Sequence, residues 1–261
     1  MKKSDFFDFA LNTTTPIAGP RGYVLDSQKV LAAVNNTRGT LKKIAEFEIN
    51  LVAILGMRNL SALVGEVFAA SMRKEFNGIL EKNPHQDGYP DLLLLDHAGK
   101  AEWSRLQNRL REKHPFSPFV PGGFEVKATC GSVPSAQVCV SRGIHKPDIG
   151  DRRIALLQGY DWKAHHRETN HLFGIVWDFI GKIPCIVAVF YSNRLTLNDW
   201  GHIVKPKQDG GRTTSVSIMT KDGIKKMYEG WVLVANSLDY AKFFDKKNKA
   251  TLLANALSAK T

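Results

Sequence analysis

Two stretches of the chain, GYPDLLLL at residues 88–95 and GGFEVKAT at residues 122–129, decide the fold that we predict. The first is an apolar run typical of a short buried strand, with Asp91 at its mouth. The second alternates with a period of two residues, as a half-buried strand does. One face of that strand carries Phe124, Val126 and Ala128, and the other carries Glu125, Lys127 and Thr129. The apolar face can pack into a core while Glu125 and Lys127 point together into a cleft.

Asp91 and Glu125 offer the ligands that a hard divalent cation such as Mg²⁺ prefers, and the backbone carbonyl of Val126 adds a third oxygen. Mg²⁺ held there would polarise a phosphate and lower the pKa of bound water. Lys127 would then orient that water, accept its proton or stabilise the developing negative charge. The same residues also fit an ordinary strand whose Glu125 and Lys127 face solvent. The Pro-Asp pair and the Gly-Gly turn favour the metal site over that alternative.

Pro90-Asp91 followed by Glu125-Val126-Lys127 resembles the motif of the PD-(D/E)xK nuclease superfamily, in particular that of the type II restriction endonucleases. The resemblance implies Mg²⁺-dependent, sequence-specific hydrolysis of double-stranded DNA that leaves 5′-phosphate ends. It also implies a companion DNA methyltransferase in the same restriction-modification system. The 34 residues from Asp91 to Glu125 exceed the spacing common in that superfamily, so we interpret residues 99–121 as an inserted helix and loop. Asp91 is preferred to Asp96 as the first acid because the Pro-Asp pair starts the strand.

The clearest strands after the motif are Leu172–Ile180 and Ile183–Ser192, which are apolar enough to be central. Gly181-Lys182 joins them, and glycine in the first position favours a type II′ turn. Residues 172–179, 190–192 and 199–201 also resemble restriction-enzyme sequence. We therefore predict an α/β fold over residues 1–261 as a single nuclease domain, with a mixed central sheet flanked by helices around a PD-(D/E)xK core.

Helical spacing of apolar residues predicts helices over about 27–55 and from an Asn59 cap to about Leu80. Strand 231–235 and a final helix over about 238–259 follow later, and residues 1–25 are interpreted as an N-terminal arm. Glu66 has no basic partner at helical spacing, so it is a candidate accessory acid in the catalytic site. A solvated surface glutamate is the alternative for this position.

A net charge of +11 favours a polyanionic partner, with nucleic acid ahead of an acidic membrane. Basic side chains in this pattern neutralise phosphates, and arginine can also read guanine. A solvated basic face is the alternative interpretation. The candidate DNA-binding residues are Arg142, His145, Lys146, Arg152, Arg153, Lys163, Lys205, Lys207 and Arg212.

The rest of the composition limits the classes of function. No apolar run reaches membrane-spanning length, and three cysteines without CxxC spacing fit a reducing, cytoplasmic location. We expect a homodimer on double-stranded DNA, since one motif per chain supplies one catalytic centre. Two alternatives stay open: a structure-specific repair or junction-resolving nuclease of the same superfamily, and a DNA-binding module without catalysis.

Overall fold

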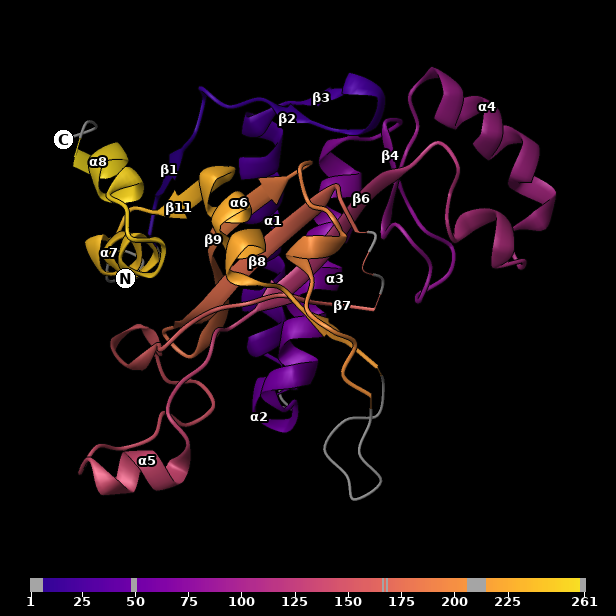
Figure 1. Cartoon of the computed structure of the whole chain (residues 1–261). Helices are drawn as coiled ribbons and strands as arrows, with labels where there is room; N and C mark the ends of the chain where they lie inside the picture. Colours follow the sequence, from indigo (N-terminus) through magenta and orange to yellow (C-terminus); the bar gives the residue numbers. More distant parts are fainter. Residues whose placement is uncertain (1–6, 48–50, 166, 168, 206–214, 259–261) are drawn as a thin grey trace.

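A mixed seven-stranded sheet forms the centre of the molecule (Figure 1). This computed structural model describes residues 7–47, 51–165, 167, 169–205 and 215–258. The strand order is β1-β11-β9-β8-β6-β5-β4, and β6 and β8 are the parallel pair among antiparallel neighbours. The sheet strands are β1 (Phe9–Leu11), β4 (Leu80–Lys82), β5 (Leu92–Leu94), β6 (Gly123–Thr129), β8 (Leu172–Ile180), β9 (Ile183–Ser192) and β11 (Trp231–Ala235). Two small antiparallel pairs add β2 (Ile17–Ala18) with β3 (Val24–Leu25) and β7 (Lys163–Ala164) with β10 (Ser217–Ile218).

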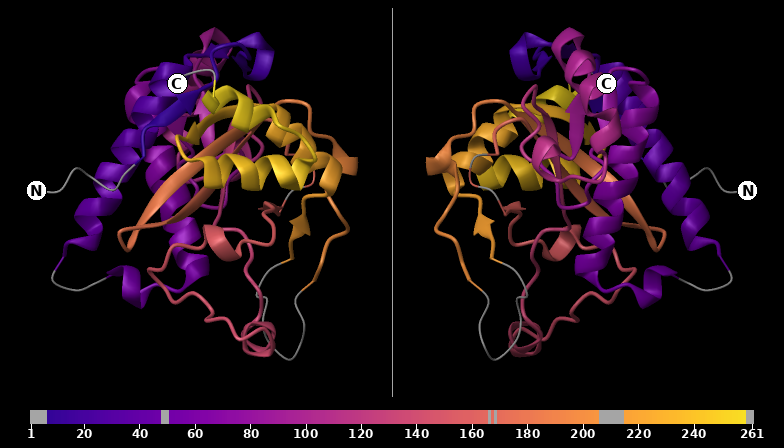
Figure 2. Two further views of the ribbon diagram at one scale, coloured as in Figure 1. Left: turned by 90° about the vertical axis from the view of Figure 1, so that its left-hand side faces the viewer. Right: turned by 90° about the vertical axis from the view of Figure 1, so that its right-hand side faces the viewer.

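Helices cover both faces of this sheet, with α1 and α3 on one side and α6, α7 and α8 on the other (Figure 2). The α-helices are α1 (Ser27–Ala45), α2 (Leu51–Ile54), α3 (Met57–Glu75), α4 (His97–Leu106), α5 (Ala136–Ser141), α6 (Lys221–Glu229), α7 (Leu238–Asn248) and α8 (Leu252–Ser258). The short 3₁₀ segments are η1 (Pro20–Gly22), η2 (Gln107–Arg109), η3 (His114–Phe116), η4 (Ile154–Leu156) and η5 (Leu197–Asp199). The predicted mixed sheet flanked by helices is confirmed.

Strand β8 explains why both faces need helices, because all nine of its residues are buried. Phe173, Ile175, Trp177 and Phe179 alternate into the core under α1 and α3. Leu172, Val176 and Ile180 point into a second core, built with α6, α7 and α8. A strand that is apolar on both faces must be central in its sheet, as the sequence predicts for β8 and β9.

The connection between β5 and β6 is a helix and loop, as predicted, and it forms a lobe of its own (Figure 1). Leu106, Phe116 and Phe119 pack there against Leu93 and Leu95. Asp96 begins the lobe as the N-cap of α4, where its carboxylate accepts the N–H of Gly99 at 2.9 Å. Its small core lets the long insertion fold without disturbing the pairing of β5 with β6.

Several predicted boundaries are wrong. The described part of the expected N-terminal arm belongs to the fold, since β1 pairs with β11 and β2 with β3. Helix α3 begins at Met57 rather than after Asn59, and Leu80 lies in β4. Gly181 and Lys182 both have positive φ, 57° and 67°, which makes their turn type I′ and not II′. The expected last helix divides into α7 and α8, because Lys249 is left-handed at φ 54°.

Among the described residues, every helix is too short or too polar to span a bilayer.

Candidate active site

The candidate site lies where β6 continues beyond the end of β5. Leu92 pairs with Phe124 and Leu93 with Gly123, so residues 125–129 extend past that short neighbour. On the other side, β6 stays paired with β8, and Glu125 donates its N–H to the carbonyl of His171 at 2.8 Å. The next N–H, that of Val126, points to the open edge and donates to Asp91 Oδ2 at 2.8 Å. The Asp91 carboxylate thus takes the place of a strand partner.

Asp91, Glu125 and Lys127 contact one another directly. The backbone N–H of Asp91 donates to Glu125 Oε2 at 3.2 Å. The Lys127 ammonium donates to Asp91 Oδ2 at 3.4 Å and to Glu125 Oε1. Asp91 Oδ1, unlike Oδ2, accepts no hydrogen bond within the described part of the chain. The structure therefore brings together the three residues on which the sequence motif rests.

Burial and charge set the protonation of this cluster. Glu125 is only 6% exposed, and burial, followed by the negative charge of Asp91, raises its pKa to about 7. Lys127 opposes that shift. Burial also disfavours the ammonium of Lys127, but the two carboxylates outweigh this effect and raise its pKa. The lysine is consequently a cation held between two acids.

A cleft of about 570 Å³ opens in front of Asp91 and Lys127. Glu125 is buried and does not line this cleft, so the expectation that Glu125 and Lys127 point into it together is wrong for Glu125. Asp91, Val126 and Lys127 line the cleft together with Glu66 from α3 and Lys163 from β7. The structure therefore places the candidate accessory acid in the same cleft as the motif. Its carboxylate is not solitary, however, because Lys82 of β4 makes an ion pair with it at 2.5 Å. That partner is 16 residues away and lies outside the helical spacing considered in the sequence.

The donor set at the open edge fits a hard divalent cation. In a strand, the N–H and C=O of one residue point to the same side. Because the Val126 N–H points to Asp91, the Val126 carbonyl also leaves β6 at the open edge. Two carboxylates and one carbonyl are oxygen ligands of the kind that Mg²⁺ prefers. Asp91, Glu125 and Val126 are thus the residues that would hold the metal.

Asp96 is separate from this site. In addition to capping α4, its carboxylate accepts from Arg21 Nε at 2.9 Å and Nη2 at 2.7 Å. The Arg21 guanidinium holds the pKa of Asp96 below its usual value, with the Gly99 N–H adding to the effect. An acid that is fully engaged in a cap and an ion pair has a structural role, so the geometry favours Asp91 as the first acid.

The candidate DNA-binding residues divide into groups. Lys163 is exposed and lines the cleft, whereas Lys146 is exposed and lines a neighbouring cavity. Arg142 and Lys205 are exposed and line neither of these two cavities. Lys207 and Arg212 lie outside the described residues.

Arg152 and Arg153 do not present the basic pair that the sequence suggests. Arg152 packs over the rings of Phe7 and Tyr240 and lies 3.4 Å from the Asp239 carboxylate, so neighbours within the fold already engage its charge. Arg153 is 7% exposed. A buried side chain does not belong to an open surface, so the expected open basic pair is not present; Arg153 instead lines the same neighbouring cavity as Lys146.

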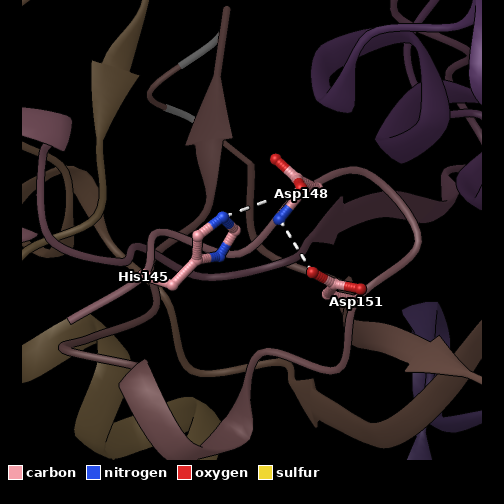
Figure 3. A group of neighbouring side chains, drawn as sticks. All are labelled: His145, Asp148 and Asp151. Atoms are coloured by element: carbon pink, nitrogen blue, oxygen red, sulfur yellow. Dashed lines mark hydrogen bonds and ion pairs between the residues drawn. The ribbon is translucent and has the colours of Figure 1, made fainter.

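His145 lies in an acidic environment, shown in Figure 3. Its Nε2 atom is 3.9 Å from Asp148 Oδ2, and the N–H of Asp148 donates to Asp151 Oδ2 at 3.0 Å. Ligand atoms of these three residues lie within 4.8 Å of one another, but all three side chains are exposed. Two carboxylates beside His145 oppose a phosphate contact, and an imidazole is not a typical Mg²⁺ ligand.

Further residues of the cleft were not singled out from the sequence. His85 and Asp87 line it from the loop before Asp91, and Asp161 lines it from the β7 side. His165 also lines it from that side. The His165 Nδ1 atom is 2.9 Å from the carbonyl oxygen of Ser215. His85 and Asp87 could have been found from their position in the sequence, because the polar stretch KNPHQD at residues 82–87 shortly precedes Asp91 and β5.

No protein-family model, no curated protein and no solved structure matches this chain.

Proposed function

We propose that this protein is a Mg²⁺-dependent endonuclease that hydrolyses phosphodiesters of double-stranded DNA, as a type II restriction endonuclease of the PD-(D/E)xK superfamily does. One observation carries the proposal: Asp91, Glu125 and Lys127 converge by direct contact at the open edge of β6. Asp91 and Glu125 are 34 residues apart in the chain. A surface strand with a chance E-x-K triplet has no reason to place a distant aspartate within its hydrogen-bonding network.

Each residue has a distinct role in this proposal. Asp91, Glu125 and the Val126 carbonyl hold the metal, and Glu66 is the accessory acid of the same cleft. When bound, Mg²⁺ supplies polarisation of the phosphate and a lowered pKa for water. Lys127 orients the attacking water and stabilises the negative charge that develops on the phosphate. Because nearby carboxylates raise its pKa, the charged amine of Lys127 is better suited to these roles than to accepting a proton.

DNA is the substrate class favoured by charge and by the form of the site. The chain carries a net charge of +11, and Lys163 lines the cleft beside Asp91, where Lys82 is paired with Glu66. A polyanion gains affinity from such positive charge. The ammonium of Lys127 would offset part of the charge of the phosphate to be cleaved. Cutting both strands of a palindrome with one site per chain requires two chains, so the active species is a homodimer on DNA.

Digestion of supercoiled plasmid with and without Mg²⁺ tests this function. Discrete linear fragments that disappear with a chelator are expected for a restriction endonuclease. Sequencing their ends would give the recognition site, the overhang and the 5′-phosphate. Cutting confined to nicked, mismatched or branched duplexes would identify a repair or junction-resolving nuclease with the same core. Binding without cutting at any Mg²⁺ concentration would leave a DNA-binding module.

A further inference from the structure

A second cavity, of about 410 Å³, adjoins the catalytic cleft. Met57, the first residue of α3, lines both cavities, so they are neighbours at the start of that helix. The other walls come from the loop before α5 and from the segment that follows it. They include Pro134, Ser135, Lys146, Asp148 and Arg153.

Among the residues that line this cavity, Arg153 favours a bound anion most. The residue is only 7% exposed, and its Nε–H is buried without a hydrogen-bond partner in the part of the chain that the structure describes. Its backbone N–H donates to Asp178 Oδ1 at 2.8 Å. Burial raises the pKa of the Asp178 carboxyl, and the Arg153 backbone N–H and the Arg153 charge oppose that shift, so Asp178 is a nearby counter-charge. A guanidinium removed from water is strongly unfavourable unless acceptors compensate it. Asp178 offsets part of this cost, and an anion in the cavity would offset more of it.

Two further features make the cavity positive. Lys146 is exposed and lines it, which adds a second cation beside Arg153. Helix α3 has 19 residues and begins there with no side-chain cap at Gly56 and no acid in its first turn. The positive end of a helix of this length favours an anion. Asp148 also lines the cavity and opposes one, but its side chain is 80% exposed and turns toward His145.

We propose that this second cavity is a phosphate site, and that it holds a backbone phosphate of the same DNA strand whose scissile phosphodiester lies at Asp91 and Lys127. The fork of donors on a guanidinium matches the oxygens of a phosphate. Because Met57 lines both cavities, they are close enough for one extended polyanion to reach both. The phosphate site stands on Arg153, Lys146 and α3 alone, whereas DNA as its occupant rests on the proposed nuclease function.

Inorganic phosphate tests the site without any nuclease activity. Thermal unfolding would be followed against phosphate concentration, with chloride at equal ionic strength as the reference. The wild type should gain stability from phosphate, as a ligand of the native state requires. Arg153→Met and Lys146→Ala should each bind phosphate about 10-fold or more weakly, the loss expected for a charged hydrogen bond. Lys246 is an exposed residue of α7 that lines neither cavity, so Lys246→Ala should behave as the wild type does.

Lys146→Ala keeps the test decisive if Arg153→Met does not fold, because Lys146 is exposed. A wild type that gains no more from phosphate than from chloride would overturn the proposal, as would variants that gain as much as the wild type.

DNA binding in Ca²⁺ tests whether a DNA phosphate occupies the second cavity. Every protein in this experiment also carries Glu125→Gln, so that the DNA is not cut. Affinity would be measured against salt concentration, and Lys146→Ala should flatten the slope by about one unit relative to Lys246→Ala. An unchanged slope would show that no DNA phosphate occupies the cavity. If phosphate binds through Arg153 but the protein neither binds nor cuts DNA, the nuclease function fails and the phosphate site stands. If the protein cuts DNA and phosphate has no effect, the site alone fails.

Discussion

Among single residues, Glu125 depends most on its surroundings. It is buried beside β8, accepts the N–H of Asp91 and contacts the Lys127 ammonium. Burial and the charge of Asp91 raise its pKa to about 7, so in the proposed site a proton would compete with the metal ion for this carboxylate near neutral pH. The other acid of the site, Asp91, is fixed by the Val126 N–H and lines the cleft. One proposed ligand thus titrates in the physiological range and the other is oriented by the backbone.

The raised pKa of Glu125 predicts how metal-free protein responds to pH. In the unfolded chain its carboxyl has an ordinary pKa of 4.5, so between pH 4.5 and 7 the folded state binds more protons. The free energy of unfolding must therefore fall as pH rises through that window, by up to about 3 kcal/mol from this group. Lys127 stays charged throughout, because its pKa is raised. Urea unfolding at pH 5, 6, 7 and 8 should show this loss in the wild type and a flatter profile in Glu125→Gln; identical profiles would contradict the shift.

Lys127 is predicted to act in the reaction rather than in the fold. Replacing it by methionine keeps the aliphatic stem but removes the charge that stabilises the reacting phosphate. Cleavage should slow by at least ~10²-fold, while DNA binding in Ca²⁺ and the circular dichroism spectrum change little. Lys225→Met, at an exposed position of α6, is the matched control and should cut normally. Equal cutting by the two variants would remove Lys127 from the mechanism.

Between elements, the site depends on the unequal lengths of β5 and β6. Because β5 has three residues and β6 has seven, β6 has an open edge where the backbone of Val126 meets a side chain and not a strand. Helix α3 contributes Glu66 to the same cleft, and β4 contributes Lys82. The four elements converge because the insertion after β5 folds into its own lobe and leaves the cleft open.

Substitution of Glu66 tests whether α3 contributes a residue to the proposed reaction. The ion pair of Glu66 with Lys82 has both side chains 44% exposed, so Glu66→Gln should change the free energy of unfolding by no more than about 1 kcal/mol. Activity should fall more, by ~10–100-fold, as for a residue that supports metal ligands. Glu46→Gln, whose carboxylate is 3.9 Å from Lys42 on α1, removes an exposed ion pair elsewhere. Should both variants cut at the wild-type rate, Glu66 contributes only a surface ion pair.

The sequence predicts the parts of this arrangement that are local. Alternation along β6 places Glu125 opposite the core face of Phe124 and Val126, and Pro90-Asp91 marks the mouth of β5. Contacts between distant segments are not encoded in such patterns. Strand β1 pairs Phe9 with Ala235, which is far away in the sequence. Without that partner, the three residues of β1 are interpreted as part of an N-terminal arm. Lys82 meets Glu66 only through the packing of β4 beside α3, and Arg153 lies next to an exposed arginine yet is buried.

The molecule as a whole places the candidate site within a well-packed sheet, where β6 continues past the end of β5. Two cores, one under α1 and α3 and one under α6, α7 and α8, hold β8 and β9 rigidly and thereby fix β6. The chain has a net charge of +11, which provides long-range attraction for a polyanion. Salt sensitivity of binding is the general consequence.

A homodimer on DNA is the prediction at this scale. With one set of Asp91, Glu125 and Lys127 per chain, a two-fold pair is the simplest assembly that cuts both strands of a palindrome. Sedimentation of Glu125→Gln with a short duplex carrying the recognition site, in Ca²⁺, should give two chains per duplex. A complex of one chain with one duplex would contradict the dimer, even if the protein cuts DNA.

The most direct measurement of the central claim compares Asp91→Asn with Asp96→Asn in plasmid digestion with Mg²⁺. Both substitutions remove one negative charge and keep a side-chain acceptor. The amide oxygen of the first variant can still receive the Val126 N–H, and that of the second can still cap α4. The proposed site predicts that Asp91→Asn loses cleavage by at least ~10²-fold, while Asp96→Asn cuts as the wild type does. Loss in Asp96→Asn with normal cutting by Asp91→Asn would show that the first acid is misassigned, and normal cutting by both would contradict the nuclease site itself.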